Sequence, residues 1–440
     1  MKLWNKTGTH TEKIIEAFTV GNDKSFDLYL APFDIQGSQA HVQMLNRIGL
    51  LTNEELSDIQ HALEEIKITV INGQFAIEEG IEDIHSQIEL ILTRKLGETG
   101  KKIHSGRSRN DQVLVDIKLF LKHELKVISR ESKLLFDQFI QLSSKHAGDL
   151  MPGYTHMQLA MPSSFGLLFS AYAESLVDDM ELIAAAYRIC DKNPLGSGSG
   201  FGSSFPLDRQ LTTELLQFNS LNVSSVYAQM TRGKTEKLVA MALASIAATL
   251  SKHAQDICLY SNQQFGFVSF PDALTTGSSI MPHKKNPDVF ELIRAKCNRI
   301  QALPNELTML AVNLPSGYHR DFQLTKEILF PALNELHACL HMTYYMLQQI
   351  IIRKDILKSA QYDLLFSVEE VNKRVLSGHP FREAYKQVGE SIANGTFSAD
   401  RELKHTHIGS IGNLGLEEIT NGMNTFEFLY QSDDLDAQEA

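Results

Sequence analysis

The chain has 440 residues, of which 43% are hydrophobic and 21% charged, and its formal net charge is −12. This composition is typical of a globular protein with a large core, and the length predicts two or three structural units. The negative balance argues against nucleic acid and anionic membranes as partners, although local lysines and arginines can still bind an anionic substrate.

The sequence shows no targeting or membrane-spanning pattern. The first residues lack the apolar core of a signal peptide, and the most apolar run, 238–250, is shorter than the ~20 residues that a spanning helix needs. The four cysteines lie far apart without a C-x-x-C pair, which disfavours a zinc site and a disulfide framework. We therefore expect a cytoplasmic protein with buried thiols.

The N-terminal quarter of the chain predicts several helices. Residues 34–48 have helical spacing, and Thr52 with Glu55 forms a capping box that opens a second helix. A third helical stretch begins near Glu82–His85. This acidic, histidine-containing start resembles half of a metal site, but no second histidine-rich cluster follows, so we expect no metal there.

Residues 104–112, with the sequence HSGRSRNDQ, are dense in hydrogen-bond donors. Two arginines beside hydroxyl and amide groups suit the bidentate capture of carboxylates. A solvated loop held by ion pairs is the alternative interpretation. The string therefore marks a candidate anion-binding segment.

Residues 111–146 contain neither glycine nor proline, and their apolar side chains recur on one helix face. Thirty-six residues at 1.5 Å each give a helix of ~54 Å, which implies an extended bundle. The sequence predicts an all-α fold: a central bundle of very long helices over 106–355, flanked by helical domains over 1–105 and 356–440, with a frayed acidic end from Ser432. Further long helices are expected over 164–190, 234–265, 288–303 and 332–374. The 234–265 stretch is apolar round much of its surface, which indicates a bundle shared in an oligomer.

Residues 195–204 are rich in glycine and serine. They lack the lysine of a phosphate-binding loop, and no strand precedes them, which disfavours a nucleotide site. We expect a flexible bend that leads into a helix at Asp208.

The segment 274–287, with the sequence LTTGSSIMPHKKNP, has no helical periodicity. Its first half is small and polar, as in a mobile loop, whereas Asn286 and Pro287 suit the cap and first position of a helix. Lys284 and Lys285 thus precede a helix N-terminus, where backbone amides already favour an anion. The segment predicts a site for a carboxylate substrate.

The string GSSIMPHKKNP at 277–287 resembles the signature of the fumarase/aspartase superfamily, the lyases that release fumarate. HSGRSRNDQ at 104–112 and GYTHMQ at 153–158 are similar to strings of one branch, argininosuccinate lyase, which includes delta-crystallin. Weaker similarities to the same branch occur at 34–38, 82–85 and 380–384, in the order that the branch has them. The resemblance therefore covers nearly the whole chain.

The resemblance implies the reversible cleavage of argininosuccinate into arginine and fumarate, as in arginine biosynthesis, with no cofactor or metal. It implies a homotetramer in which three subunits build each site. Ser278 would be the base, His156 the acid, and Lys284, paired with Glu291, would stabilise the charged intermediate. The implied substrate contacts are Ser108, Arg109, Asn110, Thr155, Asn286, Tyr318, Gln323 and Lys326.

The sequence departs from the family pattern at several places. Asp23 replaces a common serine, His283 a glutamine and Tyr385 a histidine, and residues 222–237 lack the usual D-x-V-S-x-R-D string. Two alternatives therefore remain: another fumarate-releasing lyase with an altered amine pocket, and a catalytically silent structural oligomer of the crystallin kind. Joint retention of Ser278, Lys284 and His156 favours an active enzyme.

Overall fold

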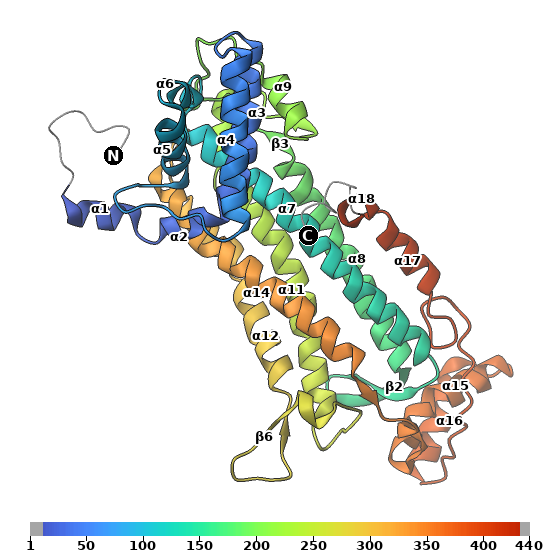
Figure 1. Cartoon of the computed structure of the whole chain (residues 1–440). Helices are drawn as coiled ribbons and strands as arrows, with labels where there is room; N and C mark the ends of the chain where they lie inside the picture. The colour runs from blue at the N-terminus through green and yellow to red at the C-terminus, as the bar shows by residue number, and fades with distance from the viewer. Residues whose placement is uncertain (1–11, 432–440) are drawn as a thin grey trace. The chain divides into compact units, whose positions relative to one another are not determined.

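The computed structural model describes residues 12–431, and helices make up most of them (Figure 1). The residues before Glu12 and the acidic end from Ser432 lie outside the described part. The chain forms two compact units. Unit 1 contains the chain up to Ile128, Leu182–Ser245 and Arg299–Leu336, and unit 2 contains Ser129–Glu181, Ile246–Asn298 and the chain from His337 onward. The predicted division into three domains at 105 and 355 stays a prediction.

Unit 1 begins with a series of helices whose caps can be read in the sequence. Thr52 Oγ1 accepts a hydrogen bond from the amide of Glu55, whose carboxylate accepts one from the amide of Thr52, so the predicted capping box is confirmed. The helices are α1 (Lys13–Val20), α2 (Asp23–Asp27), the 3₁₀ turn η1 (Leu28–Leu30), α3 (Ala31–Arg47), α4 (Asn53–Ile71), α5 (Ile84–Leu96), α6 (Glu98–Lys101) and η2 (Lys102–His104).

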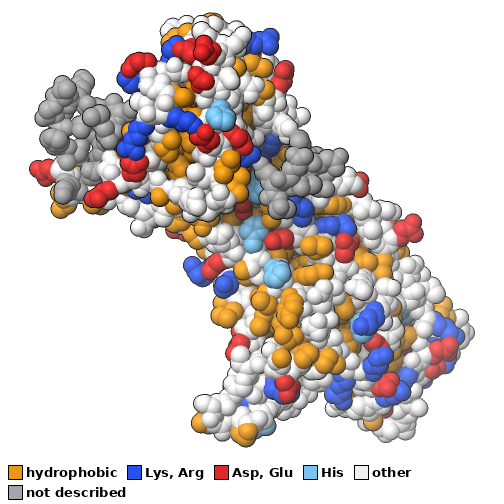
Figure 2. All heavy atoms as spheres, viewed as in Figure 1, with side chains coloured by type: hydrophobic (Ala, Val, Ile, Leu, Met, Phe, Trp, Pro, Cys, Tyr) orange, Lys and Arg blue, Asp and Glu red, His pale blue; other side chains and the backbone are white. Residues whose placement is uncertain are grey.

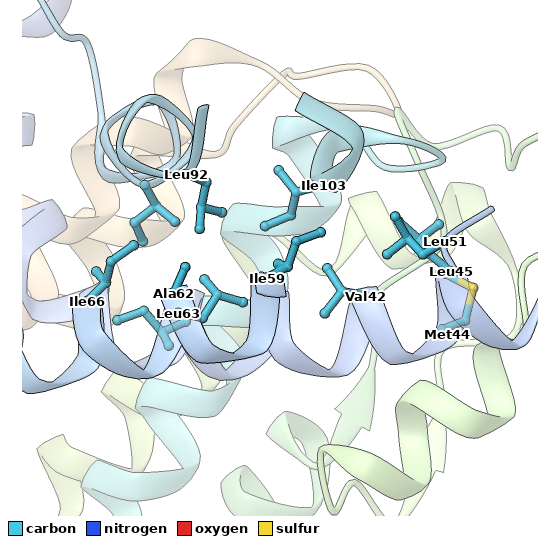
Figure 3. Packing of buried hydrophobic residues seen from close by; sticks show 12 residues of the cluster. Val42, Met44, Leu45, Leu51, Ile59, Ala62, Leu63, Ile66, Leu92 and Ile103 are labelled. Atoms are coloured by element: carbon cyan, nitrogen blue, oxygen red, sulfur yellow. The ribbon is translucent and has the colours of Figure 1, made fainter. Parts of the chain in front are cut away.

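The core of these helices is a cluster of buried aliphatic side chains (Figure 3). Val42 of α3 faces Ile59 and Leu63 of α4, and Leu92 of α5 closes the cluster from the other side. Each fully buried Leu or Ile stabilises the fold by about 1.5–3 kcal/mol relative to an exposed one. This packing fixes the start of α5, which contributes to the candidate site described below.

The long helices are present as the sequence predicts, with changed ends. α11 ends at Ser261 and not near 265, because the Asn262 side chain accepts hydrogen bonds from the amides of Gln264 and Phe265 and turns the chain. The five helices are α7 (Arg109–Lys145), α8 (Phe165–Cys190), α11 (Lys234–Ser261), α12 (Asp288–Ile300) and α14 (Leu324–Gln348), and each supplies residues to both units.

The prediction of one helix over 332–374 is wrong. α14 begins earlier, keeps Pro331 inside it and stops at Gln348. The chain then forms β8 (Ile351–Ile352), which pairs antiparallel with β5 (Val268–Ser269), and Asp355 adopts a left-handed conformation at φ 61°. Apolar spacing alone cannot show this pairing with a strand far away in sequence. After it come η5 (Ile356–Lys358), η6 (Ala360–Phe366), α15 (Ser367–Leu376), α16 (Phe381–Ala393), α17 (Leu416–Asn424) and α18 (Glu427–Tyr430).

The strands are short and occur in pairs. In unit 1, β3 (Lys192–Asn193) pairs parallel with β4 (Ser220–Leu221), and the fully buried Lys118 joins their ends by donating to Lys192 O and Asn222 Oδ1. Burial lowers the pKa of Lys118 to about 8. The other strands are β1 (Leu150–Thr155) with β2 (Gln158–Ser164), and β6 (Thr276–Gly277) with β7 (Lys285–Asn286); the remaining helices are α9 (Arg209–Leu215), α10 (Ser225–Met230), η3 (Asp272–Leu274), α13 (Leu303–Leu310) and η4 (Arg320–Gln323).

Candidate active site

Unit 1 encloses a cavity of about 270 Å³ whose walls carry charges of both signs. Five of the predicted substrate contacts line it: Arg109, Asn110, Tyr318, Gln323 and Lys326. They come from the start of α7 and from the segment that enters α14. Its other charged side chains are Asp23, Asp27, Glu82, Asp83, His85, Arg232 and Arg320. Such a mixed lining suits a substrate that itself carries both charges.

Arg109 is held in place at the N-terminus of α7. Its Nη1 lies 3.1 Å from a carboxylate oxygen of Asp83, and its Nη2 donates to Ser86 Oγ at 2.6 Å. Asp83 is also the N-cap of α5, where it accepts the amide of Ser86. The predicted donor-rich segment therefore lies beside an acidic helix start, and the guanidinium position is fixed before any ligand binds.

Asp111 connects this segment to the glycine-rich bend. Its carboxylate accepts hydrogen bonds from the amides of Ser108, Gly196 and Gly198, at 2.8, 2.9 and 2.8 Å. Burial raises its pKa to about 6. The bend does lead into α9, whose N-cap is Asp208, but the first residues of the bend are held by Asp111 of α7.

Lys326 and Gln323 are already engaged by protein groups. Lys326 Nζ lies 2.6 Å from Asp23 Oδ1 and 2.5 Å from Asp27 Oδ1, and Gln323 Nε2 donates to the carbonyls of Thr19 and Val20. Burial lowers the pKa of Lys326, but the two carboxylates outweigh it and raise that pKa above its usual value. Burial also raises the pKa of Asp23 to about 6, an effect that Lys326 partly offsets.

His85 forms a buried charged group with two aspartates. Its Nδ1 lies 3.1 Å from Asp34 Oδ1 and 3.6 Å from Asp116 Oδ2, and Gln112 also donates to Asp34. Burial alone lowers the pKa of His85, but Asp34 and the other carboxylates reverse this and raise it to about 9. The imidazole is therefore protonated at neutral pH. The side chains of Asp34, His85 and Asp116 offer ligand atoms within 4.8 Å of one another, and a cation that bound there would have to displace the proton of His85.

This pKa shift predicts a pH-dependent stability. Because the folded pKa lies above the unfolded value of about 6.5, the stabilisation by His85 is complete below pH ~6.5 and is lost as the pH rises through ~9. We expect His85→Gln to destabilise the protein by on the order of 3 kcal/mol at pH 6 and by far less at pH 9.5. Urea unfolding of both proteins at the two pH values measures this. An equal difference at both would show that His85 is not charged in the folded state.

In unit 2, His156 lies at the tip of the β1–β2 hairpin. Thr155 pairs with Gln158, and the two residues between them, His156 and Met157, have φ of 52° and 59°. Two consecutive left-handed residues are typical of the tightest hairpin turns, and a non-glycine pair in this conformation is strained by on the order of 1–3 kcal/mol for each residue. Gly153 permits the hairpin, because a Cβ there would lie 2.9 Å from the carbonyl oxygen of Met161. The strained turn exposes the imidazole.

The predicted mobile loop at 274–287 is a β-hairpin in unit 2. Thr276 pairs with Asn286 and Gly277 with Lys285, so the tip is 278–284. Ser278 Oγ accepts hydrogen bonds from the amides of Ile280 and Met281, at 3.3 and 3.1 Å. Two backbone donors aimed at one oxygen stabilise negative charge on it, as in an oxyanion hole.

The expected cap at Asn286 is wrong. This residue belongs to β7, its side-chain amide donates to Thr276 Oγ1 and Gly277 O, and α12 begins at Asp288. Lys284 is exposed at the hairpin tip, Glu291 is exposed on α12, and no ion pair joins these two side chains in the part of the chain that the structure describes. A second cavity of about 470 Å³ lies at the hairpin base, with Asn286 and Lys285 in its wall.

The structure thus divides the predicted residues between the units. One cavity in unit 1 is lined by Arg109, Asn110, Tyr318, Gln323 and Lys326. Ser108 lies directly before the first residue of α7. The others belong to unit 2, on two hairpins and on α12: Thr155, His156, Ser278, Lys284, Asn286 and Glu291.

Sequence reasoning missed most of the charged lining of the unit 1 cavity. Arg232 lies in the stretch that departs from the family pattern, and Asp23 was noted only as a departure. The i, i+4 spacing of Asp23 and Asp27, which puts both carboxylates on one helix face, is the signal that could have identified this pair.

Comparisons with known proteins agree with the motifs. The pattern of a family described as "Lyase" matches residues 5–302. An argininosuccinate lyase of Parabacteroides distasonis is 57% identical over 96% of this chain and 95% of its own length, and that of Bacteroides thetaiotaomicron is 58% identical over 95% and 94%. The argininosuccinate lyase of Xylella fastidiosa is 39% identical over 88% and 87%.

Solved structures share the fold at low identity. EDDS lyase in complex with formate superposes with a TM-score of 0.76 at 21% identity, covering 96% of this chain and 91% of its own. The class II fumarase of Schistosoma mansoni gives 0.72 at 17% identity, covering 94% and 93%. At these identities the likeness concerns the all-helical fold alone.

Proposed function

The chain belongs to the argininosuccinate lyase family, and from this membership we propose how its residues perform the reaction of that family. It is a carbon–nitrogen lyase that cleaves argininosuccinate into arginine and fumarate. The observation that carries the mechanism is the pair of backbone amides on Ser278 Oγ. A free serine hydroxyl is a very weak base, and these donors lower the energy of its ionised form.

In the proposed reaction Ser278 Oγ removes a proton from the succinyl carbon next to a carboxylate. The electron pair is first delocalised into that carboxylate, where Lys284 stabilises the added negative charge. It then forms the double bond of fumarate as the bond to the guanidinium nitrogen breaks. His156 gives its proton to this nitrogen, and arginine leaves.

We propose a homotetramer whose sites are shared between subunits. Hydrophobic side chains are exposed on the long helices of unit 2, including Leu292 of α12 and Met342 and Tyr345 of α14, and Figure 2 shows hydrophobic side chains on the surface of this part of the chain. Such a surface on a long helix is what a bundle between subunits would bury. Three subunits would contribute residues to each site.

A role in arginine biosynthesis in the cytoplasm is part of this proposal. The cysteines Cys190, Cys297 and Cys339 are buried and free, as thiols in a reducing compartment are. None of the helices in the described residues has the length and apolarity to cross a membrane.

The substrate assignment is tested by the ratio kcat/KM for four substrates of related lyases. We expect argininosuccinate to exceed adenylosuccinate, aspartate and malate by at least about 10⁴-fold, because a site built for a guanidinium leaves buried polar groups unpaired with the others. A higher kcat/KM for any of the three would contradict the assignment and favour a lyase with an altered amine pocket.

A further inference from the structure

Arg232 is a cation of the unit 1 cavity to which the sequence assigned no role. It lies between α10 and α11, its side chain lines the cavity, and the residue is only 4% exposed. A guanidinium buried to this extent is costly unless protein groups or a ligand satisfy it. Its surroundings therefore indicate what it binds.

Protein groups hold one part of the guanidinium. Glu236 Oε1 lies 3.0 Å from Nε, and Nη2 donates to the carbonyl of Phe322 at 2.8 Å. Glu236 is fixed in turn, because its Oε2 accepts the amide of Gly233. Gly233 has φ 75°, and a Cβ there would lie 2.6 Å from the Phe322 ring, so only glycine allows this close approach. Arg232 is thus preorganised without a ligand.

Other N–H groups of this guanidinium make no hydrogen bond. Nη1, which carries two of them, is buried and has no hydrogen-bond partner within residues 12–431, and Nε meets Glu236 as an ion pair without hydrogen-bond geometry. The other cations of the cavity are paired with carboxylates: Lys326 with Asp23 and Asp27, Arg109 with Asp83, Arg320 with Glu82, and His85 with Asp34 and Asp116. Arg232 is therefore the cation that can accept a carboxylate from a ligand without breaking an ion pair inside the cavity.

The neighbouring charges indicate which carboxylate this is. Asp23 and Asp27 share the single cation Lys326, so this group of three carries one net negative charge when all are ionised. A succinyl group, with two carboxylates, is repelled there, whereas an α-amino acid head places an ammonium beside its carboxylate. We propose, on the basis of the proposed function, that Arg232 binds the α-carboxylate of the arginine part of the substrate.

Arginine and agmatine, which lacks only the α-carboxylate, test this directly. We expect calorimetry with the purified full-length protein to show arginine binding about 10- to 100-fold more tightly than agmatine. In Arg232→Gln this ratio falls to about one, and the KM for argininosuccinate rises by a similar factor. Arg232→Lys, which keeps the charge but has fewer donors, restores part of the ratio.

Two controls separate binding from folding. Arg232→Gln leaves Glu236 as a buried unpaired charge, so Arg232→Gln/Glu236→Gln removes both charges and should show the same ratio of about one in a folded protein. Arg209→Gln alters another half-buried arginine of unit 1, which donates to main-chain carbonyls away from the cavity, and should keep the wild-type ratio.

The outcomes also separate this inference from the proposed function. A folded double variant that still prefers arginine over agmatine would overturn the role of Arg232, as would a wild-type protein that binds the two equally. A wild type that prefers arginine through Arg232 but releases no fumarate from argininosuccinate would contradict the proposed reaction and still support the carboxylate site.

Discussion

Ser278→Ala is expected to lower kcat for argininosuccinate by at least about 10²–10⁴-fold and to leave substrate binding nearly unchanged. The methyl group of alanine cannot accept the carbon-bound proton, and the amides of Ile280 and Met281 lose the oxygen on which they converge. In the proposed reaction Ser278 acts in the chemical step, and it does not line the cavity of unit 1, so affinity should persist. Single-turnover rates and calorimetric binding of argininosuccinate measure the two effects separately.

The adjacent Ser279 provides a matched control for Ser278. Ser279→Ala changes the same atom in the same exposed hairpin tip, one residue further on. It should keep a rate within a few-fold of wild type. If the two alanine variants lose the same activity, the hairpin as a whole matters and Ser278 is not the base.

His156→Asn is expected to lower kcat by about 10²–10⁴-fold while the hairpin keeps its shape. Asparagine tolerates the left-handed conformation that His156 adopts at φ 52°, so the substitution removes the proposed acid and keeps the turn. Without a proton donor, the leaving nitrogen must depart carrying the electron pair of the broken carbon–nitrogen bond, which makes this step slower. Steady-state rates, with circular dichroism as the check on folding, measure this.

Met157→Asn is the corresponding control, since Met157 has φ 59° at the second position of the same turn. It should remain active. Near-normal turnover of His156→Asn would assign the proton to another group, and equal losses in both variants would point to the turn and not to the imidazole.

The helices could be predicted because their signals are local. The glycine-free apolar spacing of 111–146 became α7, and Thr52 with Glu55 capped α4. Local spacing did not predict the structure correctly where pairing with a residue far away in the sequence, or across a hairpin, determines it. The helix expected over 332–374 is interrupted because Ile351–Ile352 pairs with Val268–Ser269, and the loop at 274–287 is a hairpin through pairing of Thr276 with Asn286.

The candidate site was predictable only in part for the same reason. Motifs located the serine, the histidine and the start of α7, because each lies in a short string. The partners of Lys326 lie some 300 residues away, and no local pattern shows that Asp23 and Asp27 occupy its ammonium. The sequence did not single out Arg232, because its proposed role depends on what its neighbours leave unpaired, which only the folded cavity shows.

The proposed lyase activity is tested most directly by adding argininosuccinate to the purified full-length protein and following the ultraviolet absorbance of fumarate. We expect a rising fumarate signal and arginine in an equal molar amount. A folded oligomer that produces neither would contradict the proposed activity and favour a structural protein of the crystallin kind.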